Sequence, residues 1–412
     1  MTDYPARDAS DIPSTPAVEE FEEFEEFEAT LPRLPRVDAI ATAEAPSAAP
    51  APSSYHIPWR PIIRDALILW AGTRFIYLAF TYLAAGLSQA QPAQGTGFFG
   101  LWQRFDTNWY LSIATQGYAF PQQVAFFPLY PALIRLFSLF TGGNMLVSAL
   151  IVGNLGTLAA LIALGALTAW ETRDGATPAS AMLLMLAFPF AFFFATAYTE
   201  GMFLAFAIFC LLFARRGQWG YAALFALLAG ATRPTGVVLI PPLAWEWLRQ
   251  NGLTDLDFWR ARLRQRDVAA VWIVIQRAWK ALRTSWIGLL SLIAVPAFYL
   301  AFVVFVGIRF KHPSLVLRVH RDYWGIDSAP VWKTAYREIT HIFIAPFASS
   351  AQTIMVLDTV TFLVVAALVV LFWRSMPGLY NLYMLALLYL SIAQPAIVAL
   401  QVLQSTGRFL LP

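Results

Sequence analysis

The sequence predicts an all-α fold in which many helices cross a membrane. Of the 412 residues, 58% are hydrophobic and only 13% are charged, whereas a soluble domain usually carries about 25% charged residues. Several apolar runs approach the ~20 residues that a helix needs to cross the hydrocarbon of a bilayer. These runs are continuous and lack the alternation of polar and apolar residues that marks a membrane β-barrel. We therefore expect a polytopic transmembrane helical protein.

Residues 1–58 differ in composition from the rest of the chain. They hold 12 Asp/Glu against 3 Arg, and Glu19–Glu28 reads "EEFEEFEEFE". Such a segment cannot bury enough apolar surface to offset its chain entropy, so it predicts a disordered acidic cytoplasmic tail. A docking peptide anchored by Phe21, Phe24 and Phe27 is the alternative, and this protein's own basic surface is one candidate target. Residues 59–412, the predicted membrane domain, keep 25 Lys/Arg against 13 Asp/Glu.

About nine apolar segments of the membrane domain are predicted to span. Their approximate ranges are 67–87, 145–169, 179–197, 201–214, 219–232, 235–248, 285–308, 354–373 and 377–403. No cleavable signal peptide is recognisable, so we expect the first span to act as an uncleaved signal. Residues 124–141 are apolar but contain Pro128, Pro131 and Arg135. They could span, re-enter the membrane or lie at its surface.

The distribution of basic residues predicts the orientation. Arg60 and Arg64 precede the first span, which places the N-terminus in the cytoplasm by the positive-inside rule. If 124–141 does not cross, the 249–284 loop, with eight Lys/Arg against three Asp, is also cytoplasmic. If it crosses, the later basic loops face outward, against the rule. We therefore favour a non-crossing 124–141, with 88–144 and 309–353 on the outer face.

Four ionisable residues then fall at the outer boundary: Asp106, Glu200, Arg233 and Arg408. Ionisable groups at membrane depth are costly and usually mark a site or a pathway. Each has a simpler explanation when taken singly: the two acids could stabilise helix starts, Arg233 could mark a helix end before a proline, and Arg408 could snorkel. Their convergence on one face favours a shared site.

The stretch around Asp106 predicts a helix lying at the membrane surface. Trp102, Phe105, Trp109, Leu111 and Ile113 supply an apolar side, and tryptophan and tyrosine favour interfacial depth. Such a helix would hold Asp106 at the mouth of a cavity.

Several motifs carry a family resemblance. "WQRFDTNWYLSIATQGY", from Trp102, followed by "VAFFPLYP", resembles the signature of integral-membrane mannosyltransferases related to the second mannosyltransferase of GPI-anchor synthesis (PIG-V-type). Phe105 stands where that family usually has Trp. "FPFAFFFATAYTEGMF" (188–203), "GATRPTG" (230–236) and "STGRFLLP" (405–412) resemble later motifs, so the resemblance covers about 100–412.

The resemblance implies a C-type glycosyltransferase (GT-C) fold with its active site on the outer face. It also implies a polyprenyl-phosphate sugar donor, with mannose as the sugar. The catalytic acidic residue of the superfamily corresponds to Asp106 in this sequence. An outward-facing site agrees with a lipid-borne donor because nucleotide sugars are cytoplasmic. No glycine-rich nucleotide-binding motif is recognisable.

The chemistry of these residues suggests roles. Arginine donates bidentate hydrogen bonds to phosphate, so Arg233 and Arg408, with Arg104 as a third candidate, are expected to bind the donor phosphate. Asp106 would act as general base in one inverting displacement. Candidates for sugar or acceptor binding are Glu200, Trp109, Tyr110, Tyr198 and His320. Glu200 could instead pair with an arginine, and a divalent cation between Asp106 and Glu200 is compatible with their carboxylates.

Alternatives remain for function and for individual residues. A lipid-linked sugar flippase or other transporter would also carry intramembrane charges, although we find no internal repeat. The acceptor could be a lipid, glycan or protein hydroxyl, and no nucleic acid partner is expected. Segment 311–325, which contains His320, is expected to be a solvated cap, and Arg74 to make a helix–helix hydrogen bond or to snorkel. "STGRFLLP" resembles the start of a further span, and a prokaryotic protein would lie in the plasma membrane.

Overall fold

The computed structural model describes residues 55–88, 97–175, 177–255 and 268–396, together with Leu403 and Leu410. The chain divides into two units, Met1–Pro50 and Ala51–Pro412, and every described residue belongs to the second. The predicted acidic tail, except its last four residues, and Arg408 therefore lie outside the described residues.

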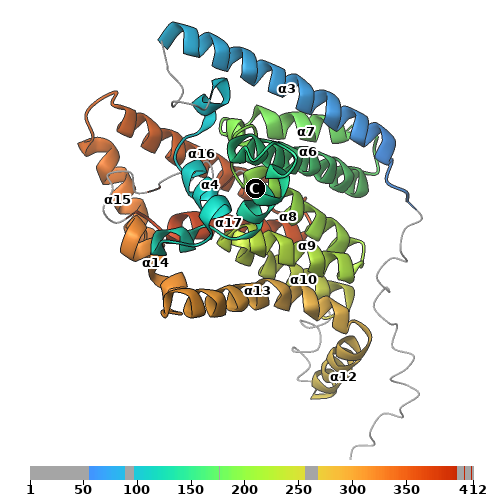
Figure 1. Ribbon diagram of the computed structural model, residues 1–412. Helices are drawn as coiled ribbons and strands as arrows, with labels where there is room; N and C mark the ends of the chain where they lie inside the picture. The colour runs from blue at the N-terminus through green and yellow to red at the C-terminus, as the bar shows by residue number, and fades with distance from the viewer. Residues whose placement is uncertain are drawn as a thin grey trace, which may run out of the picture. The chain divides into compact units, whose positions relative to one another are not determined.

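The described residues confirm the all-α prediction (Figure 1). Their only β-type pairing is a bridge between Ile326 and Ala396. The helices are α3 (Trp59–Ser88), η1 (Phe98–Trp102), α4 (Thr107–Gln116), η2 (Pro121–Ala125), α5 (Leu129–Ser138), α6 (Met145–Thr172), α7 (Thr177–Ala187), η3 (Ala191–Phe194), α8 (Glu200–Arg215), α9 (Trp219–Thr232), η4 (Pro234–Leu239), α10 (Ile240–Gln250), α12 (Val268–Thr284), α13 (Trp286–Phe310), α14 (Leu315–Trp324), α15 (Val331–Ile344), α16 (Ser350–Phe372) and α17 (Gly378–Ala393).

Within the described ranges, four helices are long and apolar enough to cross a membrane: α3, α6, α13 and α16. The chain is thus a helical membrane protein, with fewer full-length spanning helices among these residues than the nine segments predicted. The expected span 179–197 is wrong as a single helix. Helix α7 ends at Ala187, a turn follows, and η3 covers Ala191–Phe194. Pro189 disfavours helical geometry at the residue before it, which explains the interruption.

Segment 124–141, which the distribution of basic residues predicts not to cross the membrane, contains one short helix. Helix α5 has 10 residues, which corresponds to about 15 Å at 1.5 Å per residue. The hydrocarbon core of a bilayer is about 30 Å thick, so this helix alone is too short to cross it.

Small residues allow α6 and α8 to pack closely. A Cβ atom added at Gly156 would lie 2.7 Å from the backbone nitrogen of Met202, and one added at Gly201 would lie 2.2 Å from Thr157 Oγ1. Close backbone approach through small residues is a common way for helices to associate in membranes. This contact fixes the start of α8, where Glu200 lies.

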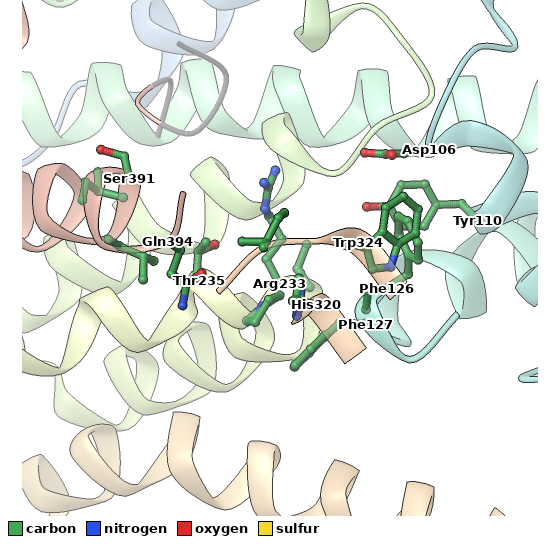
Figure 2. A pocket seen from close by; sticks show the side chains of 16 residues that line it. Asp106, Tyr110, Phe126, Phe127, Arg233, Thr235, His320, Trp324, Ser391 and Gln394 are labelled. Atoms are coloured by element: carbon green, nitrogen blue, oxygen red, sulfur yellow. The ribbon is translucent and has the colours of Figure 1, made fainter. Parts of the chain in front are cut away.

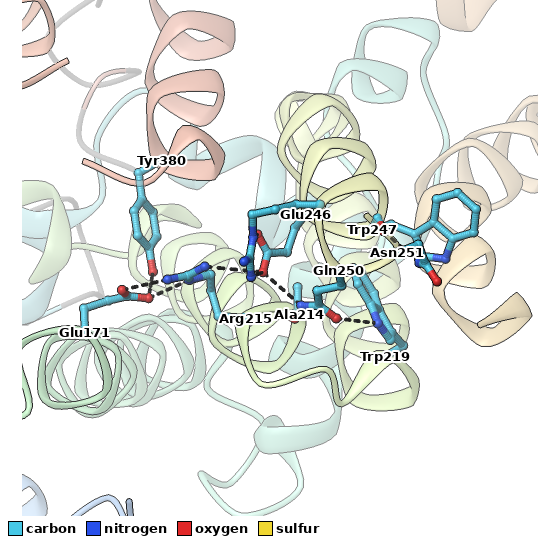
Figure 3. Close-up of polar contacts among 10 residues, drawn as sticks. Glu171, Ala214, Arg215, Trp219, Glu246, Trp247, Gln250, Asn251 and Tyr380 are labelled. Carbon is cyan, nitrogen blue, oxygen red and sulfur yellow. Dashed lines mark hydrogen bonds and ion pairs between the residues drawn. The ribbon is translucent and has the colours of Figure 1, made fainter. Parts of the chain in front are cut away.

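A polar cluster lies near the turn that joins α8 to α9, the two helices of a hairpin (Figure 3). Arg215 at the end of α8 forms a bidentate ion pair with Glu171 of α6, at 2.7 and 3.0 Å, and its Nη1 lies 3.4 Å from Glu246 Oε1 of α10. The Tyr380 hydroxyl of α17 donates to Glu171. The cluster therefore joins four helices at one end of the bundle. Helix α8 has 16 residues, so its start lies about 24 Å away.

Arg74 makes the helix–helix contact that was one of its two predicted roles. Its Nε donates to Asn154 Oδ1 of α6 at 2.7 Å, and its Nη2 donates to the Phe194 carbonyl. Asn154 also donates to the carbonyl of Ala195. Arg74 thereby fastens α3 to the segment that leads to Glu200.

Candidate functional site

A cavity of about 230 Å³ lies where four separate parts of the chain meet (Figure 2). The first part runs from Asp106 to Phe127. The other three parts are the end of α9 with the turn after it, the end of α14, and the end of α17. The residues that line it are Asp106, Tyr110, Ala125, Phe126, Phe127, Thr232, Arg233, Pro234, Thr235, His320, Trp324, Ile326, Leu387, Leu390, Ser391 and Gln394. Four residues singled out from the sequence thus share one cavity: Asp106, Tyr110, Arg233 and His320.

Asp106 directly precedes α4, and the backbone before it is strained. Phe105 has φ of 46°, a left-handed conformation that costs a non-glycine residue about 1–2 kcal/mol. The Arg104 carbonyl accepts hydrogen bonds from the Thr107 backbone N–H at 3.1 Å and from the Tyr198 hydroxyl at 3.3 Å. The Asp106 side chain makes no helix-capping hydrogen bond. The capping explanation for this carboxylate is therefore not supported, and the carboxylate lies at the cavity wall.

Arg233 lies between α9 and η4 and has an extended backbone conformation, with φ of −149°. Pro234 cannot continue the α9 hydrogen-bond pattern. A Cβ atom added at Gly236 would lie 2.7 Å from the Cα of Gly230. The tight turn of the "GATRPTG" motif therefore depends on these two glycines, and it brings Arg233 to the cavity wall.

Glu200 is the partner of Arg233. Its Oε1 lies 2.6 Å from Arg233 Nη1, and the two residues are 0% and 7% exposed. The same Nη1 also lies 3.5 Å from Thr199 Oγ1. Glu200 is not among the residues that line the cavity. Among the roles considered for Glu200, the geometry favours the arginine pair over a direct contact with a sugar.

His320 reaches the cavity from α14, within the 311–325 segment that was expected to be a solvated cap. Burial lowers the pKa of its imidazole below the ordinary value because the charged form loses hydration. A neutral imidazole can donate one hydrogen bond and accept another. His320 therefore suits contact with hydroxyl groups of a ligand.

Aromatic side chains form the wall next to Asp106. Tyr110 and Phe126 line the cavity, with ring centroids 5.1 Å apart, and the Tyr110 hydroxyl lies 3.4 Å from Thr199 Oγ1. Trp109 does not line it; its ring is stacked on Phe126 and meets Trp324 edge-on. Trp109 thus supports two residues that border the cavity, whereas Tyr198, which does not line it, donates to the Arg104 carbonyl, two residues before Asp106.

A second cavity of about 760 Å³ continues from the first. The two share part of their lining, including Arg233, Thr235 and His320. The second cavity adds an apolar wall from α13, formed by Val295, Pro296, Tyr299, Leu300 and Val303, and also reaches Arg321. Together they form one hollow with a polar part near Asp106 and an apolar part along a candidate membrane span.

The remaining predicted residues lie elsewhere. Arg104 is exposed and lines neither cavity. Arg408 lies outside the described residues. Among the described residues, no group of three or more His, Cys, Asp or Glu side chains could hold a metal ion. The sequence reading missed Thr235, Ser391 and Gln394. Gln394 offered the clearest signal, as a polar residue in the apolar stretch "LSIAQPAIV".

Comparison with known proteins assigns the family. The sequence model of the mannosyltransferase (PIG-V) family matches residues 88–317, a little over half of the chain. The chain belongs to this family. No curated protein and no solved structure matches it. The matched region of this PIG-V-family mannosyltransferase includes Asp106, Glu200 and Arg233. Membership makes it a membrane glycosyltransferase and implies a lipid-linked sugar donor and an acceptor in a membrane.

Proposed function

We propose that this protein transfers mannose from a polyprenyl-phosphate donor to a hydroxyl acceptor in one inverting displacement at the non-cytoplasmic face of the membrane. The observation that supports this most strongly is the shared hollow, in which Asp106 and Arg233 line one cavity that continues along an apolar wall of α13. A carboxylate, a guanidinium and an apolar groove are what a hydroxyl acceptor, a phosphate and a polyprenyl chain require.

Arg233 is proposed to contact the donor phosphate. A guanidinium has five N–H donors, and Glu200 orients this one through Nη1. Because the Glu200 carboxylate balances the charge of Arg233, the departing phosphate needs further positive charge. Arg321 lines the second cavity, and Arg408 remains a candidate outside the described residues. Guanidinium groups placed in this way would stabilise the leaving phosphate by charge-assisted hydrogen bonds.

The apolar wall of α13 is proposed to hold the first isoprene units of the donor. Val295, Leu300 and Val303 line the second cavity on a helix that is apolar enough to span the bilayer. Phosphate near Arg233 and a chain along α13 would place the anomeric carbon in the smaller cavity, beside Asp106.

Asp106 is proposed to act as the general base. The acceptor hydroxyl oxygen attacks the anomeric carbon, its proton passes to the Asp106 carboxylate, and the bond from the anomeric carbon to the phosphate oxygen breaks. Polyprenyl phosphate leaves with the electron pair. A positioned base contributes about 10²–10⁴-fold to such a step. His320 and Tyr110 are proposed to bind sugar or acceptor hydroxyls.

The donor class can be tested directly. The purified full-length chain in lipid nanodiscs would be supplied with a membrane lipid extract and with labelled mannose on either polyprenyl phosphate or a nucleotide. We expect transfer from the polyprenyl donor only, and the proposal fails if the nucleotide donor serves and the polyprenyl donor does not. The flippase alternative predicts translocation of the labelled lipid across vesicles without cleavage of its sugar–phosphate bond.

A further inference from the structure

Helix α12 presents an exposed apolar stripe remote from the candidate site. Figure 1 shows α12 at the end of α13 opposite to α14, which carries His320. Five apolar side chains repeat at helical spacing, and each is 42–62% exposed: Val271, Trp272, Ile275, Trp279 and Leu282. The proposed donor and acceptor sites do not use this surface.

The other side of α12 is fixed to the protein. Ala281 is only 2% exposed and belongs to the core cluster. The corner that follows α12 is held by two hydrogen bonds, from Trp247 Nε1 to the Ser285 carbonyl at 3.0 Å and from Ser285 Oγ to Asn251 Oδ1 at 3.1 Å. The apolar stripe therefore faces away from the core.

Positive charge borders this stripe. Lys280 and Arg283 are exposed on α12, and the Arg283 guanidinium lies 4.7 Å from the centre of the Trp279 ring. The sequence Val268–Thr284 contains no Asp or Glu. An apolar stripe with tryptophan and flanking basic residues is the pattern of a helix that lies in the plane of an anionic membrane surface.

The position of α12 in the chain also agrees with a membrane surface as the partner of the apolar stripe. Only Ser285 separates it from α13, one of the candidate membrane spans. The end of α12 must therefore lie close to the boundary where α13 enters the bilayer. We propose that α12 binds the anionic lipid surface at this end of the protein, with Ile275 and Trp279 among the acyl chains and Lys280 and Arg283 at the phosphate groups.

Cysteine labelling of the full-length chain tests this proposal. Cys210 is the only cysteine and is fully buried, so a cysteine introduced on the surface is labelled selectively. Ile275→Cys lies on the stripe, and its exposed neighbour Gln276→Cys, about 100° around the helix, is the matched control. Both would carry a nitroxide in vesicles of phosphatidylcholine with and without phosphatidylglycerol. In vesicles with phosphatidylglycerol, molecular oxygen, which concentrates in lipid, should collide more often with the label at 275 than a water-soluble nickel chelate does. The nickel chelate should reach the label at 276.

A separate variant tests whether binding of α12 to the lipid surface requires its positive charges. Replacing both Lys280 and Arg283 with Gln should lower the ratio of membrane-inserted to aqueous label at 275 roughly 30-fold, at about 1 kcal/mol per charge. Arg374→Gln, an exposed arginine outside α12, should leave that ratio nearly unchanged. Equal insertion with and without the two charges would overturn the anionic-lipid assignment.

Three further outcomes would overturn it as well. The first is a label at 275 that stays in water. The second is protection that disappears when residues 1–54 are deleted, which would assign the stripe to the acidic segment. The third is protection that rises with the ratio of protein to lipid, which would indicate a second copy of the chain.

Discussion

Arg233 Nη1 lies 2.6 Å from Glu200 Oε1, and this buried ion pair joins the end of α9 to the start of α8. Glu200 comes from the "TAYTEG" segment and Arg233 from the "GATRPTG" turn, so two of the sequence motifs meet in one contact. The pair places a guanidinium at the cavity and joins α8 to α9 at the end of the hairpin opposite to the turn that connects them.

Glu200→Gln should destabilise the protein because it leaves the Arg233 charge buried without its partner. Removing one member of a buried pair typically costs about 3–5 kcal/mol. The free energy of unfolding in mixed detergent micelles should fall by that order, and Glu200→Gln combined with Arg233→Gln should lose less than the sum of the single changes. Asp65→Asn, which breaks the exposed Arg64 pair, should cost about 1 kcal/mol or less. Additive losses at Glu200 and Arg233 would show that the two residues do not interact.

Gly156→Ala should disturb the start of α8. The added methyl group would meet the Met202 backbone at 2.7 Å, and overpacking of this kind costs about 1–3 kcal/mol. We expect a lower thermal midpoint and reduced transfer activity because Glu200 moves with the helix. Gly72→Ala is the matched control, since nothing lies within 4 Å of its added methyl group in α3. Equal midpoints for the two variants would contradict close packing of α6 on α8.

Tyr198→Phe should slow catalysis without unfolding the protein. Its hydroxyl donates to the Arg104 carbonyl, two residues before Asp106, and a neutral hydrogen bond of this kind contributes about 0.5–1.5 kcal/mol. The expected loss is about 2- to 12-fold in kcat, with KM for the donor little changed, because Tyr198 positions the turn and does not line the cavity. Tyr389→Phe, an exposed tyrosine, should behave as wild type. A change confined to KM would indicate that Tyr198 contacts substrate instead.

Hydrophobicity alone was sufficient to predict the helical class, but it did not predict where each helix ends. The run 179–197 is apolar throughout, yet Pro189 and the turn before η3 divide it. An apolar composition is the same for one long helix and for a short helix followed by a turn, so it cannot distinguish a single spanning helix from α7 followed by η3.

The candidate site was only partly predictable for a related reason. Asp106 and Arg233 stood out because charge at membrane depth is unusual. Ser391 and Thr235 carry small polar groups that occur in many helices and turns, so only tertiary proximity reveals them. Arg104 was the third candidate for binding the donor phosphate, but the strained Phe105 separates it from Asp106, and its side chain is exposed and lines neither cavity.

The proposed orientation predicts that residues near the two ends of the α8–α9 hairpin are labelled from opposite sides of the membrane. Asn108 is exposed near Asp106, and Asp174 is exposed near the Glu171–Arg215 cluster. In intact cells, a membrane-impermeant thiol reagent should label Asn108→Cys and should label Asp174→Cys only after permeabilisation. Labelling of both from the same side would reject the proposed orientation of the active site.

The central claim is that Asp106 takes the acceptor proton, and Asp106→Asn tests it most directly because the amide keeps the shape of the side chain but removes the base. Single-turnover mannosyl transfer from polyprenyl-phosphate mannose would be measured with purified wild type and variant, alongside donor binding. We expect transfer to fall by at least about 10²-fold while the donor still binds. Transfer near the wild-type rate would contradict the account.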